Sequence, residues 1–140
     1  MAARSKMTVL IVDDEAPVRR VLSRSLGEAG FETVCVASGE EALAITKTVL
    51  PDMVLLDLTM PSMSGMSVCR ELRSGKATRD VPIIMITGRG SVDDEILGLE
   101  TGADDYIKKP FDVGEVKVRV LNLIRRAGPF RRSFHQVWGH

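Results

Sequence analysis

Apolar residues along this chain fall into five short continuous runs, separated by segments in which they recur at helical spacing. A continuous apolar run, in contrast to an alternating one, indicates a strand that is buried on both faces. We therefore predict strands at residues 7–12, 32–37, 53–56, 81–86 and 105–108.

The segments between these runs predict helices with one apolar face. In the first of them Val18, Leu22 and Leu26 share a face, and Gly30 ends the segment. The predicted helices cover residues 16–29, 39–49, 67–73 or slightly beyond, 92–99 and, behind a cap at Asp112, 113–126. Five strands alternating with five helices predict an α/β fold: a doubly wound parallel sheet between two helical layers, an α/β/α sandwich.

The length of 140 residues suits one domain with short ends. Residues 1–6 form a polar leader that we expect to be disordered, and residues 7–126 form the domain. Gly128-Pro129 is expected to break the last helix, which would separate a tail at residues 127–140.

Aromatic residues in this tail recur at i, i+4 and i+8, as Phe130, Phe134 and Trp138. That spacing places them on one face of a helix, which would suit docking or dimerisation. A linker fragment, or residues added to the natural sequence, would also explain the tail.

Composition and charge exclude several classes of function. The chain is 44% hydrophobic and 27% charged, as globular domains are. Its 19 Lys and Arg residues balance 19 Asp and Glu residues, so no overall field attracts nucleic acid or a membrane surface. No apolar run approaches the ~20 residues of a membrane span, and no signal peptide precedes the first strand. We expect a cytoplasmic protein that binds neither membrane nor nucleic acid directly.

Polar residues follow the predicted strands at the edge of the sheet where their carboxyl ends meet. They are Asp13, Asp14, Asp57, Thr87 and Lys109. Open α/β sheets bind their ligands at this edge. Three neighbouring carboxylates repel one another and raise at least one pKa unless a cation lies between them. Mg²⁺, or Mn²⁺ in its place, is the kind of cation that carboxylates hold.

Lys109 and Thr87 add a positive charge and a hydroxyl donor to this edge. Together with a metal ion and backbone amides, they would surround the equatorial oxygens of a phosphoryl group in transfer. Asp57 would then be the nucleophile and would form an aspartyl phosphate.

Four segments, read in order, resemble the response-regulator receiver domain of two-component signalling. They are VDDE at 12–15, LDLTMP at 56–61 with Gly65 following, ITG at 86–88 and GADDYIKKPF at 102–111. Each is weak alone, but the ordered set is specific, and the resemblance covers residues 7–126. It implies a flavodoxin-like sheet with strand order 2-1-3-4-5 and five helices.

The resemblance implies a role for each acid. Asp57 would accept a phosphoryl group from a phosphohistidine of a sensor histidine kinase or a phosphotransfer protein. Asp14 and Asp57 would bind Mg²⁺ through their side chains, Asp13 mainly through water, and Thr59 through its backbone carbonyl. The chain would not be a turnover enzyme, because only its own phosphorylation and dephosphorylation would be involved.

The resemblance also assigns the residues around the phosphoryl group. Thr87, Gly88 and Lys109 would contact its oxygens. The peptide bond between Lys109 and Pro110 would be cis.

A switch is implied as well. Phosphorylation would draw Thr87 inward and let Tyr106 turn in from a more exposed rotamer. The surface of the fourth helix, fifth strand and fifth helix would then change, for partner binding or for a homodimer. Alternatively, Tyr106 merely packs on the sheet edge. Thr59 and Arg89 flank the site and would set the phosphoryl lifetime, and we expect Arg89 to slow hydrolysis by shielding the site.

Two enzyme-like alternatives fit the residues poorly. A phosphatase of the haloacid-dehalogenase type needs a second acid two residues after Asp57, where this chain has Thr59. Dinucleotide binding needs a glycine-rich turn after the first strand, and none is found there. Later in the chain, Gly88-Arg89-Gly90 is followed by Asp93 at the position where a third glycine belongs. Two contexts stay open: a stand-alone receiver that acts by binding a partner, and the receiver of a longer regulator with a DNA-binding or enzymatic output domain.

Overall fold

The computed structural model describes residues 6–88 and 102–134, with side chains as far as Arg126. Five parallel strands form one sheet in the order β2-β1-β3-β4-β5, which confirms the predicted flavodoxin-like order. The strands are β1 (Thr8–Val12), β2 (Glu32–Val36), β3 (Met53–Asp57), β4 (Ile83–Thr87) and β5 (Asp105–Lys108).

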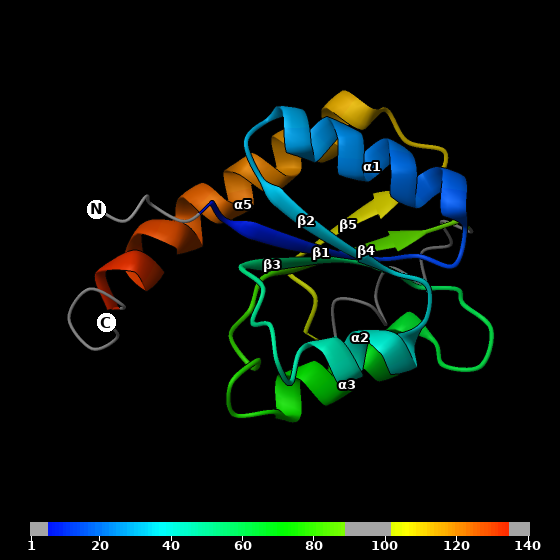
Figure 1. Cartoon of the computed structure of the whole chain (residues 1–140), viewed down its shortest axis with the longest axis horizontal. Helices are drawn as coiled ribbons and strands as arrows, with labels where there is room; N and C mark the ends of the chain where they lie inside the picture. Colours follow the sequence, from blue (N-terminus) through cyan, green and yellow to red (C-terminus); the bar gives the residue numbers. More distant parts are fainter. Residues whose placement is uncertain (1–5, 89–101, 135–140) are drawn as a thin grey trace.

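Helices cover both faces of this sheet (Figure 1). On one face lie α1 (Ala16–Glu28) and α5 (Val113–Phe134), and on the other lie α2 (Gly39–Ile45) and α3 (Gly65–Ser74). The helix predicted at residues 92–99 lies outside the described residues. The α/β/α sandwich is therefore confirmed for the part of the chain that the structure describes.

Two apolar cores lie on opposite faces of the sheet, because successive strand residues point to opposite sides. Along β1, Val9 and Ile11 belong to the core under α1 and α5, whereas Leu10 and Val12 belong to the core under α2 and α3. This double burial is the reason that the strands appear in the sequence as continuous apolar runs.

The observed helix ends differ from the predicted ones where side chains bond to the backbone. α2 ends at Ile45, earlier than the predicted residue 49, and the hydroxyls of Thr46 and Thr48 donate to carbonyls one turn back. α3 begins at Gly65, earlier than predicted, because the Ser64 hydroxyl accepts the backbone N–H of Ser67 and caps the helix there.

α5 is 22 residues long and continues through Gly128-Pro129, where a break was predicted. That prediction was wrong. A proline inside a helix removes one hydrogen bond and crowds the carbonyl of the preceding turn, which favours a kink without necessarily ending the helix. Phe130 and Phe134 therefore lie on α5 itself, whereas Trp138 lies outside the described residues.

Arg73 of α3 fixes the start of β5, the strand that leads to Lys109. Its guanidinium donates to the carbonyls of Gly102, Arg79 and Val81 and to the carboxylate of Asp104, over distances of 2.6 to 3.0 Å. These contacts join α3 to the loops that precede β4 and β5. The guanidinium packs directly over Gly102, whose φ of +106° suits glycine.

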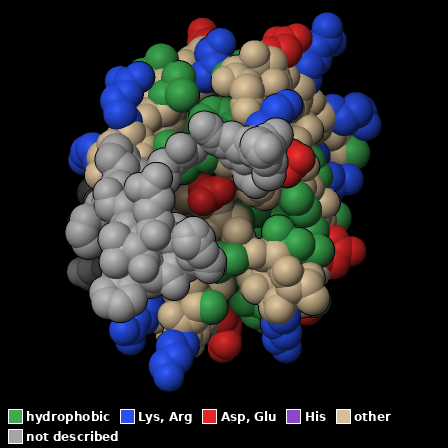
Figure 2. Space-filling view, turned by 60° about the vertical axis from the view of Figure 1, so that its left-hand side comes forward, with side chains coloured by type: hydrophobic (Ala, Val, Ile, Leu, Met, Phe, Trp, Pro, Cys, Tyr) green, Lys and Arg blue, Asp and Glu red, His purple; other side chains and the backbone are tan. Residues whose placement is uncertain are grey.

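Charged side chains of both signs are spread over the surface. In the face shown in Figure 2, the described Lys and Arg side chains are scattered around the periphery, and acidic side chains stand among them. This dispersion agrees with the balanced composition. Among the helices within residues 6–88 and 102–134, none has both the length and the apolar character needed to cross a bilayer.

Candidate functional site

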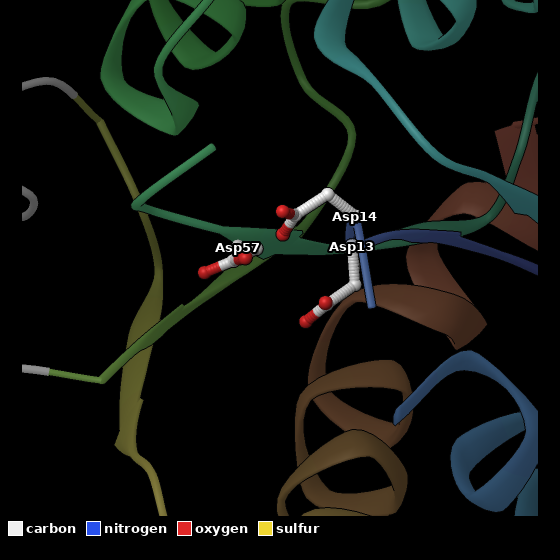
Figure 3. A group of neighbouring side chains, drawn as sticks. All are labelled: Asp13, Asp14 and Asp57. Atoms are coloured by element: carbon white, nitrogen blue, oxygen red, sulfur yellow. The ribbon is translucent and has the colours of Figure 1, made fainter. Parts of the chain in front are cut away.

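Three carboxylates meet at the carboxyl edge of the sheet (Figure 3). Val12 and Leu56 are partners in the β1–β3 register, so Asp13 and Asp57, one residue further on, emerge side by side. Both are almost completely buried, at 1% and 2% exposure, whereas Asp14 is exposed. One carboxylate oxygen from each of the three lies within 4.8 Å of the others.

Asp13 is held from two sides. Its Oδ1 accepts the backbone N–H of Glu15 at 2.9 Å, and its Oδ2 lies 3.0 Å from the ammonium nitrogen of Lys109. The second contact is an ion pair without hydrogen-bond alignment, and within the described residues this buried oxygen has no hydrogen-bond partner. Buried acceptors are nearly always satisfied, so Asp13 Oδ2 is suited to a metal-bound water or a cation.

The surroundings of Asp57 favour its protonated form. Burial, and then the negative charge of Asp13, raise the pKa of Asp57 from 3.8 to about 7. Lys109 and the backbone N–H of Thr59, which donates to Asp57 Oδ1 at 3.2 Å, lower this pKa but do not cancel the rise. A cation at this edge would favour the ionised form, which is the nucleophilic one.

Lys109 brings the positive charge into the site. Its backbone N–H donates to the Thr87 carbonyl at 2.6 Å, and its peptide bond to Pro110 is cis, as the resemblance implied. The ammonium nitrogen lies 3.0 Å from Asp13, 3.7 Å from Asp57 and 3.8 Å from Glu15. Burial lowers the pKa of Lys109, but these carboxylates outweigh that effect and raise it above its ordinary value. The ammonium is therefore charged at neutral pH.

An open cavity of about 560 Å³ lies over the acids. Its lining residues are Asp14, Glu15, Asp57, Thr59, Met60, Pro61, Gly88 and Lys109. Among the described residues, and apart from the chain neighbours of Gly88, no atom lies within 4 Å of a Cβ added at this position. Glu15 is an additional lining residue, and its place directly after the acid pair is the signal in the sequence that could have identified it.

The two proposed switch residues lie away from the cavity wall. Thr87 is completely buried and does not line the cavity. Tyr106 is half-buried, its hydroxyl oxygen is inaccessible to solvent, and it packs against the core under α2 and α3. Arg89, the expected shielding residue, lies outside the described residues, as does the predicted helix at 92–99.

The donor set fits a hard divalent cation. Carboxylate oxygens are the ligands that Mg²⁺ prefers, and Mg²⁺ commonly keeps several waters when one or two carboxylates bind it. Asp14 and Asp57 line the cavity, and one carboxylate oxygen of the buried Asp13 lies within 4.8 Å of theirs. Asp13, Asp14 and Asp57 are therefore the residues that would hold the ion, with Mn²⁺ as a chemically similar alternative.

Comparisons with known proteins agree with this geometry. The family model of the response regulator receiver domain matches residues 9–121. The probable transcriptional regulator ycf27 of Cyanophora paradoxa is 48% identical over 87% of this chain and 50% of its own length. The phosphate regulon transcriptional regulatory protein PhoB of Pseudomonas aeruginosa is 44% identical over 87% of this chain and 53% of its own length.

A solved structure shares the fold as well. The crystal structure of a response regulator from Chloroflexus aurantiacus superposes with a TM-score of 0.82 at 39% identity, and the match covers 86% of this chain and 99% of that one. The chain spans about half the length of the curated relatives it matches.

Proposed function

The chain belongs to the response regulator receiver domain family, and we propose that it is a phosphoacceptor switch that is phosphorylated at Asp57. The observation that carries this proposal is the position of Asp57, a buried carboxylate within reach of two further acids and an ammonium. An aspartate in such surroundings can attack a phosphorus atom while cationic groups stabilise the charge that develops on the phosphoryl oxygens.

Each residue of the site would have its own role in transfer of the phosphoryl group. An oxygen of Asp57 forms a bond to phosphorus as the phosphorus–nitrogen bond of a donor phosphohistidine breaks. The N–H of Thr59 holds the other oxygen of Asp57 and so orients the carboxylate. Lys109 and Gly88 line the cavity where the phosphoryl oxygens would lie. Thr87, buried at the end of β4, would supply its hydroxyl donor after a small shift.

Metal binding belongs to the same proposal. Asp14 and Asp57 would bind Mg²⁺ through their side chains, Asp13 through water, and Thr59 through its carbonyl. When bound, the ion would neutralise the acids and part of the phosphoryl charge.

The donor would be a sensor histidine kinase or a phosphotransfer protein, in the cytoplasm. The chain itself would turn over no substrate, since the phosphoryl group ends on Asp57 and is later lost to water. Thr59 and Arg89 would set the lifetime of the phosphoryl group. Phosphorylation would act through Thr87 and Tyr106 to change the surface that includes β5 and α5. A partner, or a second copy of the chain, would bind the changed surface.

The length of the relatives favours one of the two open contexts. They are named as transcriptional regulators, and this chain matches only about half of each. Of the two contexts, we therefore propose that the chain is the receiver of a longer DNA-binding regulator. The segment described here would still bind no nucleic acid itself.

One experiment tests the central proposal. The protein is incubated with acetyl phosphate and Mg²⁺, and its intact mass is measured. We expect a single phosphoryl adduct that is absent in Asp57→Asn and reduced when a chelator replaces the metal. Absence of the adduct, or its persistence in Asp57→Asn, would overturn the proposal. Asp52→Asn, on the loop before β3, is the control for loss of an acid elsewhere.

A further inference from the structure

Glu15 occupies an unusual position at the start of α1. It is the N-cap residue of that helix, yet its side chain makes no capping hydrogen bond. N-cap side chains ordinarily accept an N–H of the first turn, for which glutamate is too long. The carboxylate lies instead 3.8 Å from the ammonium of Lys109, at the lining of the acidic cavity.

Three carboxylates thus share one ammonium, and they differ in burial. The side chains of Asp13 and Asp57 are 2% and 3% exposed, so both lie within the protein, whereas that of Glu15 is 61% exposed. Glu15 therefore approaches Lys109 from the solvent side. A phosphoryl group on Asp57 would need the same ammonium.

Competition follows from the chemistry of the lysine. An ammonium is a compact charge with three N–H donors, and each contact with a carboxylate reduces what it can offer to another anion. Glu15 also adds one negative charge to the lining of a cavity that already holds Asp14 and Asp57. This charge adds to the repulsion of anionic ligands that approach from solvent.

We propose that Glu15 is a positioning residue. It holds the Lys109 ammonium in the unphosphorylated protein and competes with the phosphoryl group for that ammonium. This inference rests on the proposed function of Asp57. Glu15 thereby lowers the affinity of the site for phosphoryl-like anions and slows phosphorylation by small anionic donors.

The test measures binding of beryllium fluoride, a phosphoryl mimic, at saturating Mg²⁺, together with the rate of adduct formation from acetyl phosphate. Glu15→Gln removes the charge and leaves the backbone N–H that Asp13 accepts. We expect affinity and rate to rise roughly two- to fivefold, the range of an exposed ion pair. The gain should shrink as salt is added, because exposed charges are screened.

Glu28→Gln is the matched control. It removes one exposed glutamate from the other end of the same 13-residue helix, and it also breaks an exposed ion pair, with Arg24 at 3.5 Å. We expect this variant to behave as wild type.

A double-mutant cycle separates a contact with Lys109 from a general charge effect. In a Lys109→Ala background, the gain in beryllium fluoride affinity from Glu15→Gln should be clearly smaller than in the wild-type background, because only the general effect of its charge remains. An equal gain with and without Lys109, or no gain over the control in the wild-type background, overturns the role of Glu15. A wild-type protein that takes up neither ligand overturns the proposed function itself.

Discussion

Gly65 packs directly on the backbone of Asp57. A Cβ atom at Gly65 would collide with the Asp57 carbonyl oxygen and would lie 2.8 Å from the Cα of Leu58. The N–H of Gly65 also donates to the Leu58 carbonyl at 2.9 Å. The start of α3 is thus pressed against the end of β3, and a residue without a side chain is required there.

Gly65→Ala should therefore destabilise the protein by about 1–3 kcal/mol, the usual effect of overpacking, measured by urea unfolding. Gly27→Ala is the control, because Gly27 lies in α1 and, among the described residues, a Cβ added there would approach no atom within 4 Å apart from its chain neighbours and the backbone of its own helix. That variant should gain up to about 1 kcal/mol from helix propensity. Equal effects of the two substitutions would contradict the close contact.

The raised pKa of Asp57 predicts pH-dependent stability of the metal-free protein. Burial and Asp13 raise this pKa from 3.8 to about 7. Between these values the folded protein keeps a proton that the unfolded chain has lost, so the free energy of unfolding falls as the pH rises through this window. Urea unfolding in a chelator at several pH values measures the fall. Asp57→Asn should flatten it, and identical profiles for variant and wild type would refute the assignment.

Mg²⁺ should compete with the same proton. If binding of one ion releases the proton of Asp57, the affinity for Mg²⁺ should rise by up to about tenfold per pH unit below pH 7 and level off above it. Calorimetric titrations at pH 6, 7 and 8 would measure this rise. A flat profile would mean that Asp57 is already ionised without the metal.

Asp14 offers the cleanest test of the metal ligands, because it is exposed and its loss should disturb folding little. Asp14→Asn should lower the affinity for Mg²⁺ by at least roughly tenfold, since even outer-sphere partners of a metal are worth that much. Its free energy of unfolding without metal should change by less than about 0.5 kcal/mol. Asp80→Asn, on an exposed loop, is the control and should bind Mg²⁺ as wild type does.

Arg73 should be a main determinant of stability at the amino ends of β4 and β5, the end of the sheet away from the three carboxylates. Arg73→Gln removes most of the hydrogen bonds to Gly102, Val81 and Asp104 and should cost about 2–4 kcal/mol in urea unfolding. Arg70→Gln removes an exposed arginine from the same helix and should cost less than about 0.5 kcal/mol. Similar losses in both variants would contradict the role of these bonds.

The sheet and the acid cluster could be predicted because both follow from strand order and periodicity. Continuous apolar runs indicated strands buried on both faces, and in a parallel sheet their carboxyl ends must meet at one edge. Asp13, Asp14 and Asp57 had to lie together once the strands were identified. The sequence also predicted that the pKa of one carboxyl group would rise. That this group is Asp57 depends on the burial of the side chains and on the position of Lys109, which only the structure shows.

Other features depend on contacts that the local sequence does not contain. The continuation of α5 through Pro129 was missed, because a proline is a strong but not absolute signal for a helix end. Glu15 was missed because its role depends on Lys109, which is distant in the sequence and arrives beside it only through the packing of the sheet. Three of the five bonds of Arg73 are likewise long-range, because Gly102 and Asp104 are 29 and 31 positions away in the sequence.

The assembly of the site from separate strands has a consequence for newly made protein. Asp13 follows β1, Asp57 ends β3, and Lys109 follows β5, the last strand of the sheet and one of its edges. Non-local parallel pairing is intrinsically slow to form. In a nascent or half-folded copy, Asp57 is therefore an ordinary aspartate without its ammonium. If Asp57 accepts a phosphoryl group as proposed, such a copy would lack the ammonium that stabilises the transfer, and phosphorylation would be confined to completely folded molecules.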